Sequence, residues 1–140
     1  MAITVRWADE TKRVLLQEFN GTWTWDDYDR MVDTMWVMIR SVAHKVNIVG
    51  DIRYTAPQHN KCAMMHFQRA YYGIPDNVGK IIVVGKGFFA TKLFRMMLDM
   101  YRPMRQRVVF AASFDEALHV ANGSLEALIS FQQPMMQSPV

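Results

Sequence analysis

The sequence is poor in the residues that cross-link or interrupt a fold. A single cysteine, Cys62, excludes an internal disulfide, so we expect a reducing, cytoplasmic location. No apolar run approaches the roughly 18 residues that a membrane-spanning helix needs, so no transmembrane segment is expected. The first residues carry no charged segment followed by an apolar stretch, and we therefore expect no secretion signal.

Glycine and proline are also scarce, with 7 and 5 residues, whereas hydrophobic residues make up 51% of the chain. This composition excludes a disordered or fibrous protein and supports a packed core. The length of 140 residues fits one domain. We place that domain at residues 1–131 and expect the polar, proline-containing stretch 132–140 to be a frayed tail.

Positive charge is concentrated in one stretch. The net charge is only +3, but residues 80–107 hold seven basic side chains against the single acidic Asp99. We interpret this stretch mainly as a solvated helix face with a basic loop, and secondarily as a surface for anions. The aromatic residues nearby recur at helical spacing, which is typical of a core, so nucleic acid is not the expected partner.

Five segments have the pattern of strands. Alternating apolar residues over 3–7 and an apolar run over 14–19 predict an antiparallel hairpin, which Asn20-Gly21 ends. Short apolar runs predict three further strands, buried on both faces, at 46–50, 81–84 and 108–111.

The segments between the later strands have helical periodicity. We predict helices over about 25–43, 60–72 and 88–101, and a last helix that Ser113 begins with capping-box spacing. Thr24 has the position of an N-cap for the first. The order is therefore ββαβαβαβα, an α/β fold in which an N-terminal antiparallel hairpin joins a mostly parallel sheet of about five strands with flanking helices.

Four segments carry a resemblance to a known family: Phe19-Asn20-Gly21-Thr22-Trp23-Thr24-Trp25-Asp26-Asp27-Tyr28, Val49-Gly50-Asp51-Ile52-Arg53, Ile82-Val83-Val84-Gly85 and Ser113-Phe114-Asp115-Glu116-Ala117-Leu118. Over about residues 3–130 the chain resembles the SpoIIAA-like branch of the STAS superfamily, which is related in fold to the lipid-binding SEC14 (CRAL-TRIO) domains. The resemblance implies a small cytosolic module for protein interaction or ligand sensing rather than catalysis.

One feature of that family is missing. In its anti-sigma-factor antagonists, the loop after the central strand presents a phosphorylatable serine just before a helix. The corresponding stretch here, 51–60, contains no serine and only Thr55. We therefore do not transfer the phosphoacceptor role to this chain.

No arrangement of side chains predicts catalysis or a metal. His59, Cys62 and His66 share one side of a predicted helix, but the two histidines lie two turns apart, about 10 Å along the axis, too far for one zinc ion. No Gly-x-Ser-x-Gly motif is present, and Ser113 is explained as a cap. An acidic cluster (Asp26, Asp27, Asp29 and Asp33) is explained mainly by helix-start electrostatics. We expect no enzyme, cofactor or metal.

A ligand, if one binds, is expected beyond the carboxyl ends of the parallel strands, where open sheets of this kind bind ligands. The segment Gly85-Lys86-Gly87 follows a predicted buried strand and leads into a helix, although glycines also serve simply to turn the chain. The candidate binding residues are Asp51, Arg53, Thr55, Lys86 and Gly87.

Methionine is abundant, with 12 residues, and the predicted helix 88–101 is apolar on nearly every face. A helix that is apolar all round must be covered all round, so we expect a surface for a partner, most simply a homodimer interface. The candidate contacts are Trp36, Met38, Phe94, Leu98 and Tyr101. The leading hypothesis is a non-catalytic regulatory or protein-interaction module that dimerises through its methionine-rich helices. The alternative is a carrier of a lipid or other anionic amphiphile, with an apolar pocket beside that helix and Lys86, Arg95 or Arg102 at the headgroup.

Overall fold

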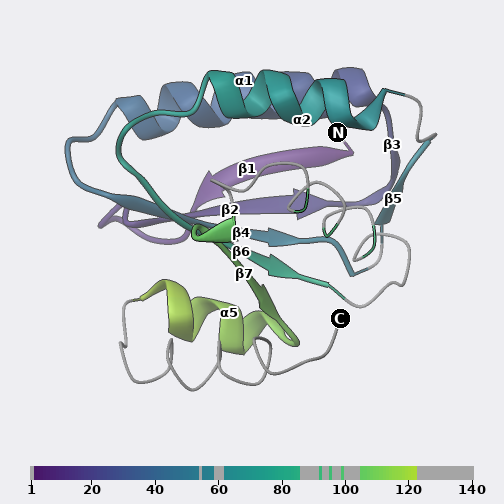
Figure 1. The fold of residues 1–140 in the computed structure, drawn as a ribbon. Coiled ribbons are helices and arrows are strands. Elements are labelled where there is room, and N and C mark those ends of the chain that lie inside the picture. The colour runs from purple at the N-terminus through teal and green to yellow at the C-terminus, as the bar shows by residue number, and fades with distance from the viewer. Residues whose placement is uncertain are drawn as a thin grey trace.

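The computed structural model describes residues 2–53, 55–58, 62–85, 92, 95, 99 and 105–122. A five-stranded sheet with the order β1-β2-β4-β6-β7 forms its centre (Figure 1). Only β1 and β2 pair antiparallel, and every other neighbouring pair is parallel. The mostly parallel α/β sheet with an antiparallel edge is therefore confirmed. Its strands are β1 (Ile3–Trp7), β2 (Val14–Phe19), β4 (Val46–Asp51), β6 (Val78–Val84) and β7 (Val108–Ala111).

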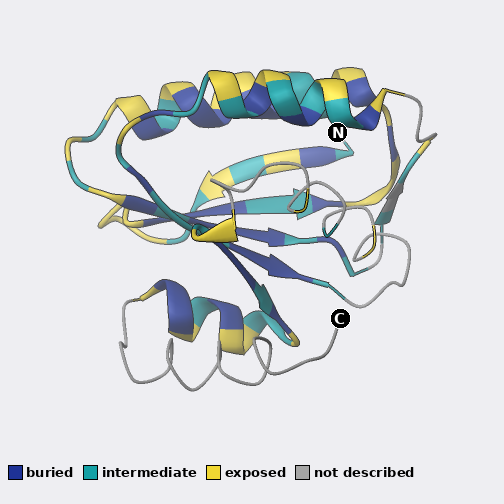
Figure 2. Ribbon diagram, viewed as in Figure 1, coloured by how far each residue is buried: buried dark blue, intermediate teal, exposed yellow. Residues whose placement is uncertain are grey.

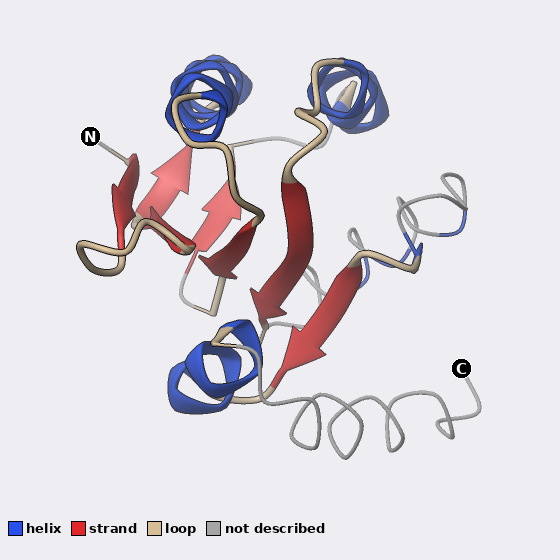
Figure 3. Ribbon diagram, turned by 90° about the vertical axis from the view of Figure 1, so that its left-hand side faces the viewer, coloured by secondary structure: helices blue, strands red, loops and turns tan. Residues whose placement is uncertain are grey.

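Helices cover both faces of this sheet. Helices α1 (Trp25–Arg40) and α2 (Ala63–Tyr72) lie side by side on one face, and α5 (Phe114–Ala121) lies on the other (Figures 1 and 3). The predicted helix 88–101 and the predicted tail 132–140 fall outside the described residues, apart from positions 92, 95 and 99. Among the helices described, none combines the length and apolar character needed to cross a membrane.

A second, small sheet was not expected. Strands β3 (Gly21–Trp23) and β5 (Thr55–Pro57) pair parallel, and the Thr55 hydroxyl donates a hydrogen bond of 2.6 Å to the Gly21 carbonyl. The prediction that Asn20-Gly21 ends the strand is right for β2, but the chain resumes extended structure at once. Gly21 makes this possible because its φ of 63° lies in the left-handed region that suits glycine.

The sheet separates two hydrophobic clusters, and buried positions line both of its faces (Figure 2). The larger cluster, between the sheet and the α1/α2 pair, includes Leu15, Met35, Ile39, Ile48 and Phe67. The smaller one, beneath α5, includes Val14, Leu16, Val49, Ile82, Val109 and Val120. Strands buried on both faces explain the continuous apolar runs in the sequence.

Thr24 is the N-cap of α1, as predicted, and it forms a full capping box with Asp27, which was not predicted. The Thr24 side chain accepts a hydrogen bond from the Asp27 amide at 3.1 Å, and the Thr24 amide donates to an Asp27 carboxylate oxygen at 3.0 Å. These hydrogen bonds from Thr24 lower the pKa of Asp27 below its ordinary value of 3.8. The stabilisation by Asp27 is therefore fully present at neutral pH and is lost as the pH falls through that lowered pKa.

Substitution of the cap tests its contribution. We expect Thr24→Ala to lower the free energy of unfolding by about 1 kcal/mol, because the Asp27 amide at the helix start loses its partner, the Thr24 hydroxyl. Urea unfolding followed by circular dichroism measures the change. Thr34→Ala, at an exposed position of the same helix, is the matched control and should not destabilise the protein. Equal losses for both variants would contradict the assignment.

The other end of α1 differs from the prediction. The helix stops at Arg40 rather than at residue 43, and Ser41 is its C-cap. The side-chain amide of Asn77 donates to the carbonyls of Ile39 and Val42 at 2.8 and 3.0 Å. Carbonyls that face Asn77 are satisfied without another helical turn, which explains the earlier end. His44, which the sequence leaves isolated, also has a partner, since its Nε2 lies 2.8 Å from the Lys12 carbonyl oxygen.

Candidate functional site

Two of the predicted ligand-binding residues, Asp51 and Arg53, lie together, but they bind each other rather than leaving their charges for a ligand. Arg53, which follows β4, binds Asp51 through both ends of its guanidinium, with N–O distances of 3.0 and 2.8 Å. Partial burial acts to raise the pKa of Asp51, but the hydrogen bonds and positive charge of Arg53 outweigh it and hold that pKa below its ordinary value. The pair thus shapes the turn after β4, and its charges already compensate each other.

The remaining predicted ligand residues are not gathered around that pair. Thr55 lies in β5, where its hydroxyl is engaged by Gly21. Lys86 and Gly87 fall outside the described residues, so the anion site at the segment 85–87 stays a prediction.

One predicted interface residue is wrong. Trp36 is only 6% exposed and belongs to the larger core cluster, and its indole Nε1 donates to the Ala70 carbonyl at 3.2 Å. The physical reason is that α1 is covered twice, by the sheet beneath it and by α2 beside it. Met38 is half-buried and also packs against that cluster. The large apolar side chains that are exposed on these two helices are Val37, Met65 and Tyr72.

The other predicted contacts, Phe94, Leu98 and Tyr101, fall outside the described residues. The homodimer through methionine-rich helices therefore remains a hypothesis with no support from Trp36.

Two acidic residues of α1, Asp29 and Asp33, bind basic residues of α2. Asp29 lies 2.9 Å from Nδ1 of His66, whose ring stacks on Trp25 with a centroid distance of 5.0 Å. Asp33 pairs with Arg69 at 2.9 Å. Helix-start electrostatics therefore do not account for Asp29, whose main contact joins the two helices. In the part of the chain that the structure describes, no three His, Cys, Asp or Glu side chains converge on a possible metal position.

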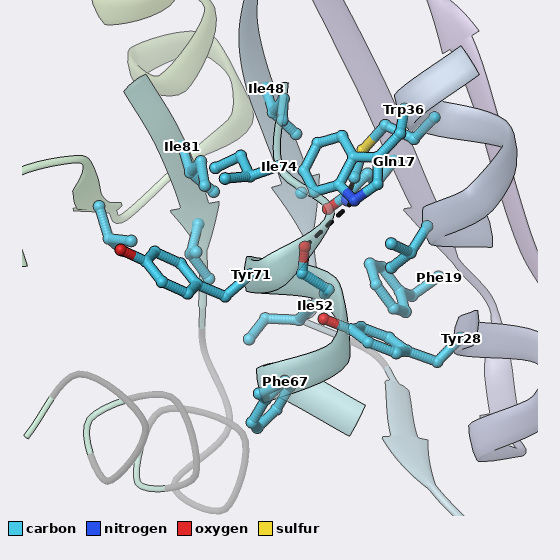
Figure 4. A pocket seen from close by; sticks show the side chains of 16 residues that line it. Gln17, Phe19, Tyr28, Trp36, Ile48, Ile52, Phe67, Tyr71, Ile74 and Ile81 are labelled. Atoms are coloured by element: carbon cyan, nitrogen blue, oxygen red, sulfur yellow. Dashed lines mark hydrogen bonds between the residues drawn. The ribbon is translucent and has the colours of Figure 1, made fainter. Parts of the chain in front are cut away.

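An apolar cavity of about 70 Å³ lies between the sheet and the α1/α2 pair (Figure 4). Its walls are mostly aliphatic and aromatic side chains from β2, β4, β6, α1 and α2. Figure 4 shows Phe19, Ile48, Ile52, Phe67, Ile74 and Ile81 around it. Small-molecule sites are usually apolar with a few polar groups, as this cavity is, but they enclose about 300–1,000 Å³, so this cavity suits only a very small molecule or part of one.

Gln17 of β2 brings an amide into these walls. Its Nε2 lies 3.4 Å from the sulfur of Met31 and 3.1 Å from that of Met35, and a thioether is only a weak acceptor. Among the described residues, nothing donates a hydrogen bond to its carbonyl oxygen, Oε1. Gln17 therefore has capacity to bind a further polar group.

Gly50 of β4 makes room for this amide. Gln17 and Gly50 are directly paired across β2 and β4, and a Cβ on Gly50 would lie 2.5 Å from Oε1 of Gln17. A side chain at this position would force the amide to move. Because Gly50 has no side chain, the Gln17 amide can lie over β4 at the floor of the cavity.

Tyr28 of α1 supplies a second polar group. Its ring packs against Trp23 and Phe67, and its hydroxyl points into the cavity toward Ile52 (Figure 4). Burial, with a smaller effect of the Asp29 charge, raises the pKa of Tyr28, so the side chain is a neutral phenol at neutral pH. Its hydroxyl makes no hydrogen bond with any residue that the structure describes.

Neither polar group was predicted from the sequence, although Gln17 leaves a signal there. Leu15, Gln17 and Phe19 alternate along β2, so they face the same side of the sheet, and Leu15 and Phe19 are core residues. A glutamine between two buried apolar positions is the irregularity that could have been noticed. Tyr28 leaves none, since it fits the apolar stripe of α1.

Comparison with known proteins gives no further guide: no family model, no curated protein and no solved structure matches this chain.

Proposed function

We propose that this protein is a non-catalytic module that binds a small, neutral, mainly apolar molecule between its sheet and the α1/α2 helix pair. The observation that carries the proposal is the Gln17 amide, which faces the apolar cavity: its carbonyl oxygen accepts no hydrogen bond from any described residue, and its nitrogen lies near the sulfurs of Met31 and Met35. A partly buried amide without good partners costs free energy, which a ligand with a matching donor and acceptor would recover.

The proposal favours the ligand-binding alternative over the protein-interaction hypothesis, and it changes the expected ligand. The described residues that line the cavity include no Lys or Arg, so their chemistry does not favour an anionic headgroup. An amide and a phenol instead suit a neutral amide, alcohol or ketone. An engineered cavity of about 150 Å³ binds benzene, so the part of the ligand enclosed here would be smaller than a benzene ring.

We retain the kinship with the SpoIIAA-like branch of the STAS superfamily as a proposal, and the mostly parallel α/β sheet with one antiparallel edge is compatible with it. A sensing or carrying role, without catalysis, is what that resemblance implies. Among the described residues that line the cavity with Gln17 and Tyr28, no nucleophile stands beside an acid or base. This lining fits binding rather than reaction.

A titration with acetamide tests the proposal, because this probe joins a neutral amide to a methyl group and is smaller than benzene. We expect it to shift the backbone NMR signals of Gln17 and Gly50, and we expect acetate, its anionic counterpart, to bind at least about tenfold more weakly. Gln17→Leu removes the amide at similar size and should weaken acetamide binding by about tenfold. Gly50→Ala displaces the amide and should have a similar effect.

The control is Gln106→Leu, which makes the same change at an exposed position outside the cavity and should leave binding unaltered. Circular dichroism of each variant checks that it folds. Absence of shifts at Gln17 and Gly50 in the wild-type protein would overturn the proposal, and so would undiminished binding by a folded Gln17→Leu variant.

A further inference from the structure

The outer side of β1 is a free edge of the sheet. β1 has β2 as its neighbour on one side, and no strand among the described residues pairs with the other. The Asn20 amide donates to the Ala2 carbonyl and the Ala8 amide donates to the Val14 carbonyl, so even-numbered residues point their backbone groups toward β2. By the alternation of an antiparallel ladder, Ile3, Val5 and Trp7 direct their amides and carbonyls outward.

Among the described residues, this edge has little of the usual protection against pairing. Proteins block exposed edges with proline, bulges, charged side chains or a covering helix or loop. β1 contains no proline, pairs with β2 in unbroken register, and its one charged residue, Arg6, forms an ion pair with Glu18. The edge is therefore open to another strand.

The pattern of β1 is complementary to itself. If two β1 strands pair antiparallel with Val5 opposite Val5, Ile3 of each copy lies opposite Trp7 of the other, and Thr4 lies opposite Arg6. Ile3, Val5 and Trp7 belong to or pack against the α1-side core, so apolar side chains would meet on that face. On the opposite face each Arg6 faces a threonine, and the two Arg6 side chains are diagonal neighbours whose charges are each paired with Glu18 of the same copy.

The surface beside the edge has room and balanced charge. A groove of about 220 Å³ runs between β1 and α1, and its walls carry one acidic and one basic side chain, Asp27 and Arg30. Two copies that meet here bring no excess of either charge together, although the whole chain has a net charge of +3. The groove also leaves space for side chains of an added strand, as in other cases of strand addition.

We propose that two copies of this chain associate through antiparallel pairing of their β1 strands, centred on Val5, to form one continuous sheet. This interface differs from the methionine-rich helices and does not depend on a ligand in the cavity. It places backbone hydrogen bonds between the two Val5 residues and between Ile3 and Trp7 of opposite copies.

Size-exclusion chromatography with multi-angle light scattering tests the proposal. We expect the wild type to have twice the mass of one chain at micromolar concentration. Val5→Pro removes the central outward amide without removing a hydrogen bond to β2, and should halve the mass. Val5→Ala keeps that amide and should remain dimeric. Circular dichroism checks the fold of both variants.

A cross-link provides an independent test of the register, also if Val5→Pro fails to fold. Residues opposite each other in a hydrogen-bonded pair have Cα atoms about 5.5 Å apart, within the range of a disulfide. In a Cys62→Ser background, Val5→Cys should form a covalent dimer under mild oxidation, whereas Ala43→Cys, at an exposed turn, should not. A monomeric wild type, a dimer that persists in folded Val5→Pro, or no Val5→Cys cross-link would each overturn the proposal.

Discussion

Replacement of Ile39 by alanine is expected to lower the free energy of unfolding by about 2–5 kcal/mol. Ile39 lies on α1, is fully buried and belongs to the larger core cluster between the helix pair and the sheet. The substitution removes apolar contacts and leaves a void that rigid neighbours fill only in part. For a domain of this size each kcal/mol corresponds to about 2–4 °C in the unfolding midpoint. Thermal unfolding followed by circular dichroism measures the shift.

The matched control is Val37→Ala, two residues away on the same helix. Val37 is 67% exposed, so its substitution removes little buried surface, and alanine is the better helix former. We expect its effect to stay within about 0.5 kcal/mol of zero. If the two variants were equally destabilised, the assignment of α1's inner and outer faces would be wrong.

Removal of the Asn77 side chain is expected to cost about 1–3 kcal/mol of unfolding free energy. Its Nδ2 lies 2.8, 3.0 and 3.1 Å from the carbonyl oxygens of Ile39, Val42 and His44, where α1 ends and the chain turns toward β4. In Asn77→Ala these half-buried carbonyls lose their donor. Urea unfolding measures the loss.

Two further variants separate the hydrogen bonds from the volume of the side chain. Asn77→Asp keeps the shape but presents a carboxylate instead of a donor, so at neutral pH it should destabilise at least as strongly as alanine. Asn20→Ala, at an exposed position, is the control for loss of an asparagine and should have little effect. A stable Asn77→Asp variant would show that the donor is not what matters.

The sequence predicts the five strands of the large sheet and its antiparallel edge well because the signals are local and strong. The runs at 46–50, 81–84 and 108–111 are continuous and apolar, and each became a strand buried on both faces. Thr24 and Ser113 cap helices as predicted, because capping depends on side chains three residues apart.

What the sequence does not predict depends on contacts between distant segments. The three-residue strands β3 and β5 have no periodic pattern. They form because Gly21 and Thr55, which are 34 residues apart in the sequence, come together in the fold. Trp36 lies beside the stripe that faces the sheet, so only the position of α2 shows that it is buried. The same holds for Asp29, whose contact with His66 joins two helices.

The separation of the two hydrophobic clusters by the sheet has a consequence for local dynamics. Only the α1/α2 side contains the proposed binding cavity, whereas α5 packs on the other side against β4, β6 and β7. Occupancy of the cavity should therefore slow hydrogen–deuterium exchange of amides in α2 and leave those of α5 nearly unchanged. The layer formed by α5 would remain closed, and only the α1/α2 layer would open and close to admit a ligand.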